Sequence, residues 1–459
     1  MAAETLPEML PEFEHNGLSW NALLKLPRDN HATSAITYGI ELQFLVPILS
    51  QNQPDPHPND RRPVIRAKED AIESDVFDLV SDRILNIIRS GTRVPAWTHP
   101  GPPYPGPEVI ATLDPESQAV ARMPAYSQWV AEIDQSLVPP YNLYPMYSWV
   151  GVKVKSSKRN TSWDNHFDQV GKVIVALRDT LRMRLGPTTS LMVHVGFAAW
   201  DISTLEIGPE FLRVFCTLWW FIEPQVQCLA DRSRHTHSEC QLLTQRSRLH
   251  RTPQAELVEE LTKNGSYDGT WKLFYDRVSA LVPQALIPRR LSDELEAIWS
   301  AEDAKAIAQM MAVPVVIGIV MEETGAVAPF STWGRGSVGF QGFCQGAWPE
   351  SVKGNNDGET GTIEFRSMEG TLDPLLIVNW LAVVIRLVDF ARRGNHDDIR
   401  AIIHKALGMY SVVDLLKDLD LAEQATYFTS KLMEQESKDL TQEAMDTLFV
   451  PPYFIPPTW

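Results

Sequence analysis

The chain has 459 residues, of which 44% are hydrophobic, and it carries a formal net charge of −17 at pH 7. This length and composition are typical of a soluble globular protein with one large domain or two. The acidic balance excludes the broad basic surface that nucleic-acid binding needs, so we expect no nucleic-acid partner. It remains compatible with a local basic pocket for an anionic ligand.

The sequence contains no segment that resembles a targeting signal or a membrane span. Residues 1–17 are acidic and lack the apolar core of a signal peptide. The longest mostly apolar runs, 310–321 and 375–385, are shorter than the ~20 residues that cross a bilayer. We therefore expect a cytoplasmic protein without membrane contact. The oligomeric state is not readable from the sequence.

The four cysteines form no CxxC pair, which is typical of reduced thiols in a cytoplasmic protein. His235, His237 and Cys240 are close enough in sequence to be considered as metal ligands. No second ligand group with suitable spacing accompanies them, so the sequence predicts no metal site there.

The domain organisation follows from composition along the chain. Residues 1–34, rich in Pro, Glu and Asn, are expected to form a loosely packed extension. A single domain is expected at 35–450, with loop insertions near 50–65 and 98–115, followed by a Pro-rich aromatic tail at 451–459.

Apolar residues at intervals of three and four predict several helical segments. These segments are 67–90, 167–185, 209–230, 256–286, 291–321 and 375–390. Asp373 can cap the last helix, and Pro374 occupies its first position, where no amide donor is needed. This helix is apolar nearly all round, which indicates burial.

Four segments alternate between apolar and polar residues, as strands with one buried face do. Their polar sides carry Glu41 and Gln43 in 36–47, Lys153 and Lys155 in 149–157, Met192 and His194 in 188–197, and Glu364, Arg366 and Met368 in 362–368. A fifth segment, 126–136, is either a strand that runs into a turn or a simple Asp/Ser turn around Asp134.

Each polar group also has a structural explanation. Glu364 and Arg366 can form an internal salt bridge, because buried charges need partners. His194 can be a structural histidine, and Lys153 can point to solvent. The repetition of the pattern in four strands favours a shared functional surface, because the polar sides of neighbouring strands lie together.

The segment after residue 363 resembles a known family. Glu364, Phe365 and Arg366, the run 369–374 (EGTLDP) and Trp380 resemble the closing motif of the amidoligases. Members of this fungal and bacterial family are assigned as ATP-dependent carboxylate–amine ligases. Their fold is similar to the catalytic sheet of glutamine synthetase and glutamate–cysteine ligase.

Further blocks resemble the same family. Residues 39–44 are similar to its G-x-E-x-E-F strand, and residues 190–196 to its G-L-H-V-H-V-G strand. Residues 129–136 are similar to its W-x-V-x-x-D-x-S segment, and 151–156 to its G-V-E strand. The helix at 209–230 resembles the family helix that precedes an arginine, here Arg234.

The resemblance implies an α+β fold. We expect a twisted, mainly antiparallel sheet in which the four strands are neighbours. Helices are expected on its apolar face, and a polar pocket on the other face.

Three departures bear on the chemistry. Gln43 and Lys153 stand where the family has carboxylates, and Met192 stands where it has a histidine. Mg²⁺ prefers carboxylate oxygens, and an ammonium group repels it. We therefore expect that Mg–ATP ligation is lost and that no metal is bound.

The expected function is catalysis on a small-molecule metabolite, with fungal secondary metabolism as the setting that the family suggests. The expected catalytic residues are Lys153, His194, Glu41, Glu364 and Arg366; the expected substrate-binding residues are Gln43, Met192, Arg234, Asp134 and Glu369. Two alternatives stay open: a working amide-forming ligase that uses Mg and ATP, and a non-catalytic binding protein.

Overall fold

The computed structural model of the chain describes residues 14–15, 18–19, 34–92, 96–98, 128–139, 146–161, 166–199, 204–205, 207–235, 237, 240–263, 281–282, 289–320, 327–334, 336–340, 343, 361–393, 395–437 and 449–450. These residues form an α+β fold around one mainly antiparallel open sheet, which confirms the expected fold class.

The main sheet has the strand order β13-β14-β9-β3-β7-β6-β5. The path consists of β13 (Val338–Gly339), β14 (Ile363–Phe365), β9 (Leu191–Ala199), β3 (Ser34–Ser50), β7 (Ser148–Lys155), β6 (Trp129–Ile133) and β5 (Ala96–Thr98). Three short strands pair beside this path: β4 (Ile65–Ala67) and β8 (Arg159–Asn160) with β3, and β10 (Thr204–Leu205) with β9. The four predicted strands are therefore neighbours, and the segment at 126–136 supplies the fifth strand.

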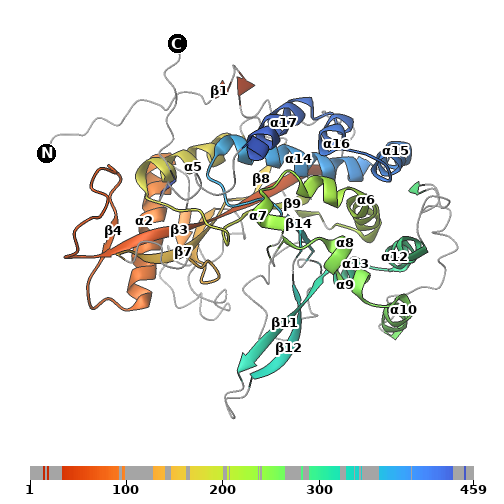
Figure 1. The fold of residues 1–459 in the computed structure, drawn as a ribbon, viewed down its shortest axis with the longest axis horizontal. Coiled ribbons are helices and arrows are strands. Elements are labelled where there is room, and N and C mark those ends of the chain that lie inside the picture. The colour runs from red at the N-terminus through yellow and green to blue at the C-terminus, as the bar shows by residue number, and fades with distance from the viewer. Residues whose placement is uncertain are drawn as a thin grey trace.

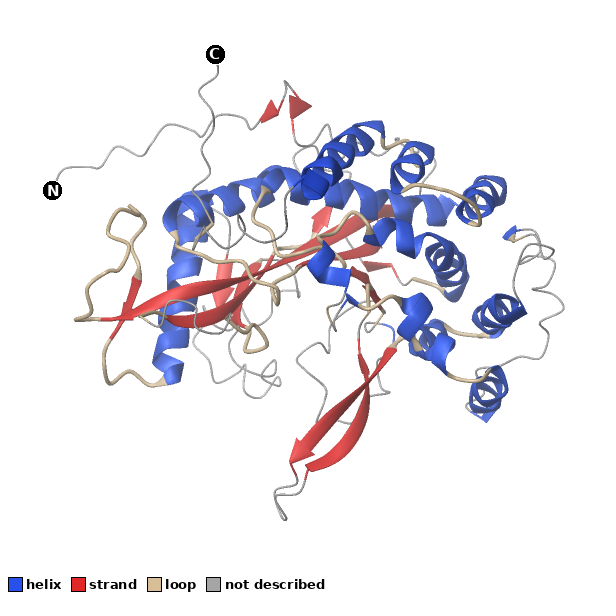
Figure 2. Cartoon of the chain, viewed as in Figure 1, coloured by secondary structure: helices blue, strands red, loops and turns tan. Residues whose placement is uncertain are grey.

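One face of the sheet is apolar, as the alternation predicted. Ile36, Tyr38, Ile40 and Leu42 of β3 are all at most 1% exposed. Helices α2 (Glu73–Thr92), α5 (Asp168–Thr180), α6 (Pro209–Gln227) and α14 (Pro374–Arg393) contribute to the same apolar core. Figure 1 shows α5 and α14 along one side of the sheet, and Figure 2 shows the surrounding helical layer.

The remaining helices and the second hairpin complete the described architecture. They are α7 (Arg232–His235), α8 (Leu243–Arg246), α9 (Arg248–Arg251), α10 (Gln254–Lys263), α12 (Arg289–Ser300), α13 (Ala304–Met311), α15 (His396–Ala406), α16 (Val412–Asp418) and α17 (Ala422–Ser437). The strands β11 (Val313–Val320) and β12 (Val327–Gly334) form a hairpin that projects away from the helical layer (Figure 1), and β1 (Glu14–His15) pairs with β2 (Leu18–Ser19).

Helix α14 begins as the sequence predicts. The Asp373 side chain accepts a hydrogen bond from the Leu375 amide, and Pro374 is the first helical residue. The helix is long and apolar enough to cross a membrane by composition, but 89% of its most apolar window is buried inside the structure. It is therefore packed as a core helix, with Trp380 fully buried.

Several predicted boundaries are wrong. The helix predicted at 67–90 begins only at Glu73, because residues 65–67 pair with β3 as β4. The helix predicted at 167–185 ends at Thr180. The segment predicted as helix to residue 321 changes at Val313 into a strand whose β-branched residues favour extended backbone.

The strand predicted at 362–368 is shorter than expected, since β14 ends at Phe365. Met368, which the alternation predicts on the polar face, is fully buried in the hydrophobic core. The chain leaves the strand geometry after Phe365, so alternation no longer decides which way its side chains point.

A buried carboxylate ties α6 to two distant segments. Glu223 accepts hydrogen bonds from the amides of Leu243 (2.7 Å) and Thr244 (2.9 Å) and from the hydroxyl of Ser337. The Ser337 amide also donates to the Gln241 carbonyl at 2.9 Å. The chain therefore leaves this point near residue 241 and returns to it at 337.

Other predictions fall on residues outside the described ranges. They concern most of the 1–34 extension, most of the loop near 98–115, and the tail at 451–459. The single domain at 35–450 stays a prediction.

Candidate functional site

The polar face of the sheet brings the predicted side chains together through the strand register. Lys153 of β7 lies opposite Gln43 of β3 on one side and Glu132 of β6 on the other. Glu41 lies opposite Lys155 and Met192. Residues paired in register point to the same face, so the functional groups of five strands lie on one face in adjacent cross-strand rows.

Five of these residues form a cluster of close charges, which we call the charged cluster: Glu41, Glu132, Lys153, Lys155 and His194. The Lys155 ammonium nitrogen is 3.1 Å from a Glu132 carboxylate oxygen and 4.0 Å from one of Glu41. The Lys153 nitrogen is 3.6 Å from Glu132 and 3.9 Å from Glu41. Each lysine of β7 thus lies between two carboxylates, one on each of the strands that flank β7.

Glu41 is the centre of the charged cluster. Its side chain is 8% exposed, and its carboxylate oxygen lies 3.3 Å from His194 Nε2. Burial alone raises the pKa of the Glu41 carboxyl, but Lys153, His194 and Lys155 together outweigh burial and hold the pKa well below its ordinary value. Glu41 is therefore ionised at neutral pH.

His194 lies between the charged cluster and the strand β14. Its Nδ1 is 3.4 Å from the hydroxyl oxygen of Thr362. An ionised carboxylate can only accept hydrogen bonds, so the proton of the neutral imidazole ring belongs on Nε2, which faces Glu41. In the neutral ring, Nδ1 then carries the lone pair.

A second ion pair lies on the neighbouring strand. Arg366 donates to Glu364 at 2.6 Å, and the same nitrogen is 3.1 Å from the Met192 sulfur. Both charged side chains are at most 7% exposed. The predicted internal salt bridge therefore exists, and its carboxylate, Glu364, lies opposite His194 in register.

Gln43 has a structural set of partners. Its amide nitrogen donates to Asp134 at 2.7 Å, and its amide oxygen accepts from the Ser190 amide at 3.0 Å and from the Ser190 hydroxyl. An amide can donate and accept at once, which a carboxylate cannot do. Gln43 thus links β3 to the residue that follows β6 and to the residue that precedes β9.

Two predicted substrate-binding residues lie apart from the charged cluster. Arg234 is 1% exposed, and its guanidinium donates to the backbone carbonyls of Thr189 and Arg366. Glu369 accepts from Lys431 at 2.6 Å and from the Asp231 amide at 2.8 Å. Both hold segments around the sheet, and their proposed contact with substrate stays a prediction.

Cys240, considered above as a metal ligand, also has a structural position. It is buried, and its thiol donates to the Arg366 carbonyl at 3.1 Å. His235 contacts the Gln227 carbonyl at 3.0 Å. These contacts account for two members of the H-x-H-x-x-C cluster without a metal.

Glu132 and Lys155 belong to the charged cluster but are not among the predicted site residues. Glu132 alternates with Trp129 and Ala131, which are buried, so its position on the polar face was readable from the pattern. The Asp/Ser turn interpretation of this segment hid the strand. Its position beside Lys153 depended on the strand order, which alternation does not give.

The charged cluster does not suit Mg²⁺ with ATP. The described residues contain no group of three His, Cys, Asp or Glu side chains that could hold a metal ion. The two carboxylates of the charged cluster, Glu41 and Glu132, are already paired with Lys153 and Lys155. A divalent cation would have to displace these ammonium groups or lie beside them.

Comparison with known proteins does not establish a family for the chain. No family model matches it, and no curated protein matches it. A solved structure described as a novel glutamine synthase homolog matches with a TM-score of 0.28 and 12% sequence identity, covering 91% of this chain and 68% of that chain.

Proposed function

We propose that this protein is an enzyme with an amidoligase-like fold that acts on a small-molecule metabolite without Mg–ATP. In this proposal the charged cluster supplies acid–base and electrostatic catalysis. The observation that carries it is the pair of lysines, Lys153 and Lys155, held between Glu41 and Glu132 at distances of 3.1–4.0 Å. Fixed ammonium groups can stabilise negative charge that develops on a substrate.

His194 is the proton-transfer group in this proposal. Its Nδ1 takes the proton of the Thr362 hydroxyl, 3.4 Å away, while that hydroxyl takes a proton from the substrate, and the ring becomes an imidazolium ion. Ionised Glu41, 3.3 Å from Nε2, stabilises the positive charge formed on the ring. The electron pair left on the substrate is stabilised by Lys153 and Lys155, and the imidazolium later returns the proton to the product.

The Glu364–Arg366 pair has a binding role in this proposal. Arg366 is fixed by Glu364 at 2.6 Å and therefore presents its guanidinium in one orientation. A carboxylate or another anionic group of the substrate is its natural ligand. The three groups that contact substrate are thus the Thr362 hydroxyl, the lysine pair and Arg366.

Calorimetric titration with ATP, with and without Mg²⁺, tests the loss of ligase chemistry. We expect no Mg²⁺-dependent binding of ATP. Micromolar, Mg²⁺-dependent binding would overturn that part and favour the amide-forming ligase instead.

Exchange of substrate protons with deuterated water, followed by NMR over a panel of small organic acids and carbonyl compounds, tests proton transfer. We expect exchange catalysed by the unaltered protein and lost in His194→Gln and Lys153→Ala. The matched controls are His404→Gln and Lys172→Ala, which change exposed residues on α15 and α5. Full exchange activity in both cluster variants would rule out the proposed roles.

A further inference from the structure

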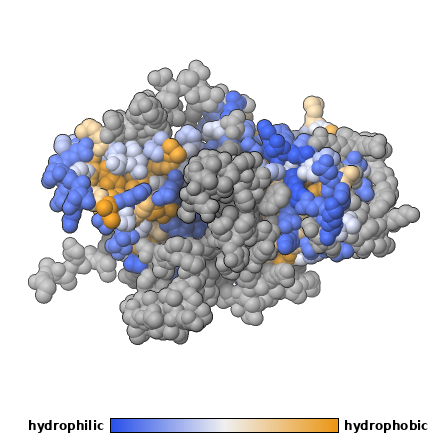
Figure 3. Space-filling view, turned by 90° about the horizontal axis from the view of Figure 1, so that it is seen from below, coloured by the Kyte–Doolittle hydropathy of each residue, from blue (hydrophilic) through white to orange (hydrophobic). Residues whose placement is uncertain are grey.

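An aromatic cluster lies at the end of the sheet where β4 pairs with β3, and it is separate from the main hydrophobic core. Leu49 and Tyr147 are its buried members, and Val64, Trp149 and Phe449 pack against them. Figure 3 shows hydrophobic residues beside hydrophilic ones at the left end of the molecule, where Figure 1 places β4. Among these five residues, Phe449 comes from the C-terminal part of the chain, so a distant segment completes the cluster.

The ring of Phe449 lies against four side chains, which we call the aromatic slot: His57, Tyr147, Trp149 and Arg182. Its centroid is 5.4 Å from that of His57 and 5.8 Å from that of Tyr147, in both cases edge to face. The Trp149 ring is tilted against it at 6.3 Å, and the guanidinium carbon of Arg182 lies 5.7 Å from its centroid. Edge-to-face and cation–π contacts need an aromatic ring, so the aromatic slot favours an aromatic side chain over an aliphatic one.

The backbone of Val450 is held as well. Its amide donates to the carbonyl of Met183 at 2.7 Å, and its carbonyl accepts from Arg62 at 2.6 Å. Arg184, next to Met183, exchanges two hydrogen bonds of 2.8 Å with Leu45 of β3. The C-terminal segment therefore binds through its backbone to a segment that is itself paired with the sheet, as peptides bind at sheet edges.

These contacts define a short recognition motif. The aromatic slot requires an aromatic side chain at position 449, and the Met183 carbonyl requires an amide N–H at position 450, which proline lacks. Arg62 binds a backbone carbonyl and so places no demand on the side chain. The motif is thus an aromatic residue followed by any residue except proline.

The aromatic slot is held in shape by the rest of the chain. Arg182 donates to both carboxylate oxygens of Asp55 at 2.8 Å, and to two backbone carbonyls of the loop 51–63 at 2.7 and 2.8 Å. The Tyr147 hydroxyl donates to Asp55 at 3.3 Å and lies 2.8 Å from Nδ1 of His57. None of these contacts uses the C-terminal segment, so the aromatic slot does not depend on it. A site that is formed before binding costs less ordering when its ligand enters.

We propose that the aromatic slot, together with Arg62 and Met183, is a peptide-binding site whose resident ligand is Phe449–Val450 of the same chain. A separate peptide or a partner protein that presents the same motif can replace this ligand. A ligand tethered by a short linker acts at a millimolar effective concentration, so an outside peptide should bind poorly until the resident side chain is removed.

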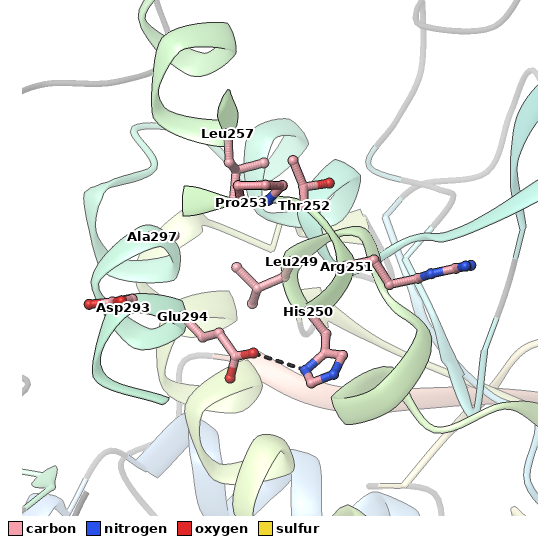
Figure 4. A pocket seen from close by; sticks show the side chains of 9 residues that line it. All are labelled: Leu249, His250, Arg251, Thr252, Pro253, Leu257, Asp293, Glu294 and Ala297. Atoms are coloured by element: carbon pink, nitrogen blue, oxygen red, sulfur yellow. Dashed lines mark hydrogen bonds and ion pairs between the residues drawn. The ribbon is translucent and has the colours of Figure 1, made fainter. Parts of the chain in front are cut away.

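The proposed peptide site shares no residue with the charged cluster, so this inference is independent of the proposed catalysis. It is also distinct from the cavity of about 250 Å³ between the α9–α10 segment and α12. Figure 4 shows that cavity, in which His250 is paired with Glu294 at 3.0 Å.

A fluorescein-labelled peptide of residues 445–453 (MDTLFVPPY) is the probe, and fluorescence polarisation measures its affinity for the full-length chain. We expect Phe449→Ala, which vacates the aromatic slot, to bind this peptide at least about tenfold more tightly than the unaltered protein does. Met409→Ala, which shortens a fully exposed apolar side chain, is the control and should bind the peptide like the unaltered protein. Equal affinity of Phe449→Ala and the unaltered protein, or no binding to Phe449→Ala, would overturn the proposal.

Variant peptides test the motif without altering the fold of the protein. Measured on the Phe449→Ala protein, peptides that carry Phe449→Ala or Val450→Pro should each bind about tenfold more weakly, because the first loses the ring and the second the amide donated to Met183. The Val450→Thr peptide keeps the amide and nearly the same shape, so it is the matched control and should bind like the unchanged peptide. Unchanged affinity of the Phe449→Ala and Val450→Pro peptides would contradict the motif.

Size-exclusion chromatography with light scattering distinguishes a segment bound within its own chain from one bound to a second copy. We expect the unaltered protein and Phe449→Ala to have the same molecular mass. A dimer of the unaltered protein that Phe449→Ala dissociates would place the segment on a neighbouring copy and overturn its assignment to the same chain.

Discussion

Replacing Lys153 and Lys155 together by Met leaves the buried carboxylate of Glu41 and the half-buried carboxylate of Glu132 without their ammonium partners. At 3.1 Å, the Lys155–Glu132 distance, the Coulomb energy is about 5 kcal/mol for an effective dielectric constant of 20. Desolvation of the lysines offsets part of this, because all four side chains are less than a quarter exposed. We expect the double variant to lose about 3 kcal/mol of unfolding free energy at pH 7.

The loss of unfolding free energy should depend on pH through the pKa of Glu41. In the unaltered protein the pKa of Glu41 is lowered, so its contribution is present above the ordinary pKa and is lost as pH falls through the lowered folded value. Without the lysines, burial dominates and the folded pKa of Glu41 rises. The loss of stability should therefore be larger at pH 7 than at pH 4.

Urea unfolding at both pH values, followed by circular dichroism, measures the effect. Lys172→Met, at an exposed position of α5, is the control and should stay within about 0.5 kcal/mol of the unaltered protein. If the double variant unfolds at the same urea concentration as the control at pH 7, the ion pairs contribute nothing. The ion pairs would then not be what holds the side chains of the charged cluster in place.

Three further predictions address the framework of the site. Glu223→Leu leaves several buried donors without their acceptor, and thermal unfolding should show a loss of about 3–5 kcal/mol. Asp55→Asn removes the paired hydrogen bonds from Arg182 (2.8 Å) and should lower the free energy of unfolding by about 1–2 kcal/mol at neutral pH. The Arg182 contact lowers the pKa of Asp55 to about 2, so this difference should shrink as pH falls from 4 towards 2, which urea titrations can measure. A Cβ at Gly151 would overlap a backbone carbonyl oxygen just after β6, so Gly151→Ala should lower the free energy of unfolding by about 2 kcal/mol in the same assay. The control is Gly208→Ala, which should unfold like the unaltered protein because nothing lies within 4 Å of its added Cβ.

The polar face of the sheet was predictable because alternation has a period of two. Glu41, Lys153, His194 and Glu364 lie on one face because each alternates with residues that are buried in the core. Alternation says which face a side chain occupies, not which strands are neighbours. The strand order entered through the family resemblance and is confirmed by the pairing of β14, β9, β3 and β7.

The wrong or missing predictions arise where the local sequence pattern does not determine the structure. Met368 lies beyond the last paired residue of β14, where the period of two no longer holds. The strand β11 follows directly on the helix α13, and its apolar run is compatible with either structure in sequence alone. The Glu294–His250 pair joins residues far apart in sequence, so no local pattern indicates it.

Ser337 binds both the Gln241 carbonyl and the Glu223 carboxylate, and this junction bears on how the chain can vary in evolution. Residues 242–336 leave the sheet and return to the same place, so their length does not alter the spacing of β9 and β14. The entropy of closing such an excursion grows only slowly with its length. Relatives of this protein can therefore differ greatly here, in the hairpin and in the helices around His250, while the strands that carry the charged cluster keep their register. A replacement segment needs only to begin beside 241, end beside 337 and cover α6.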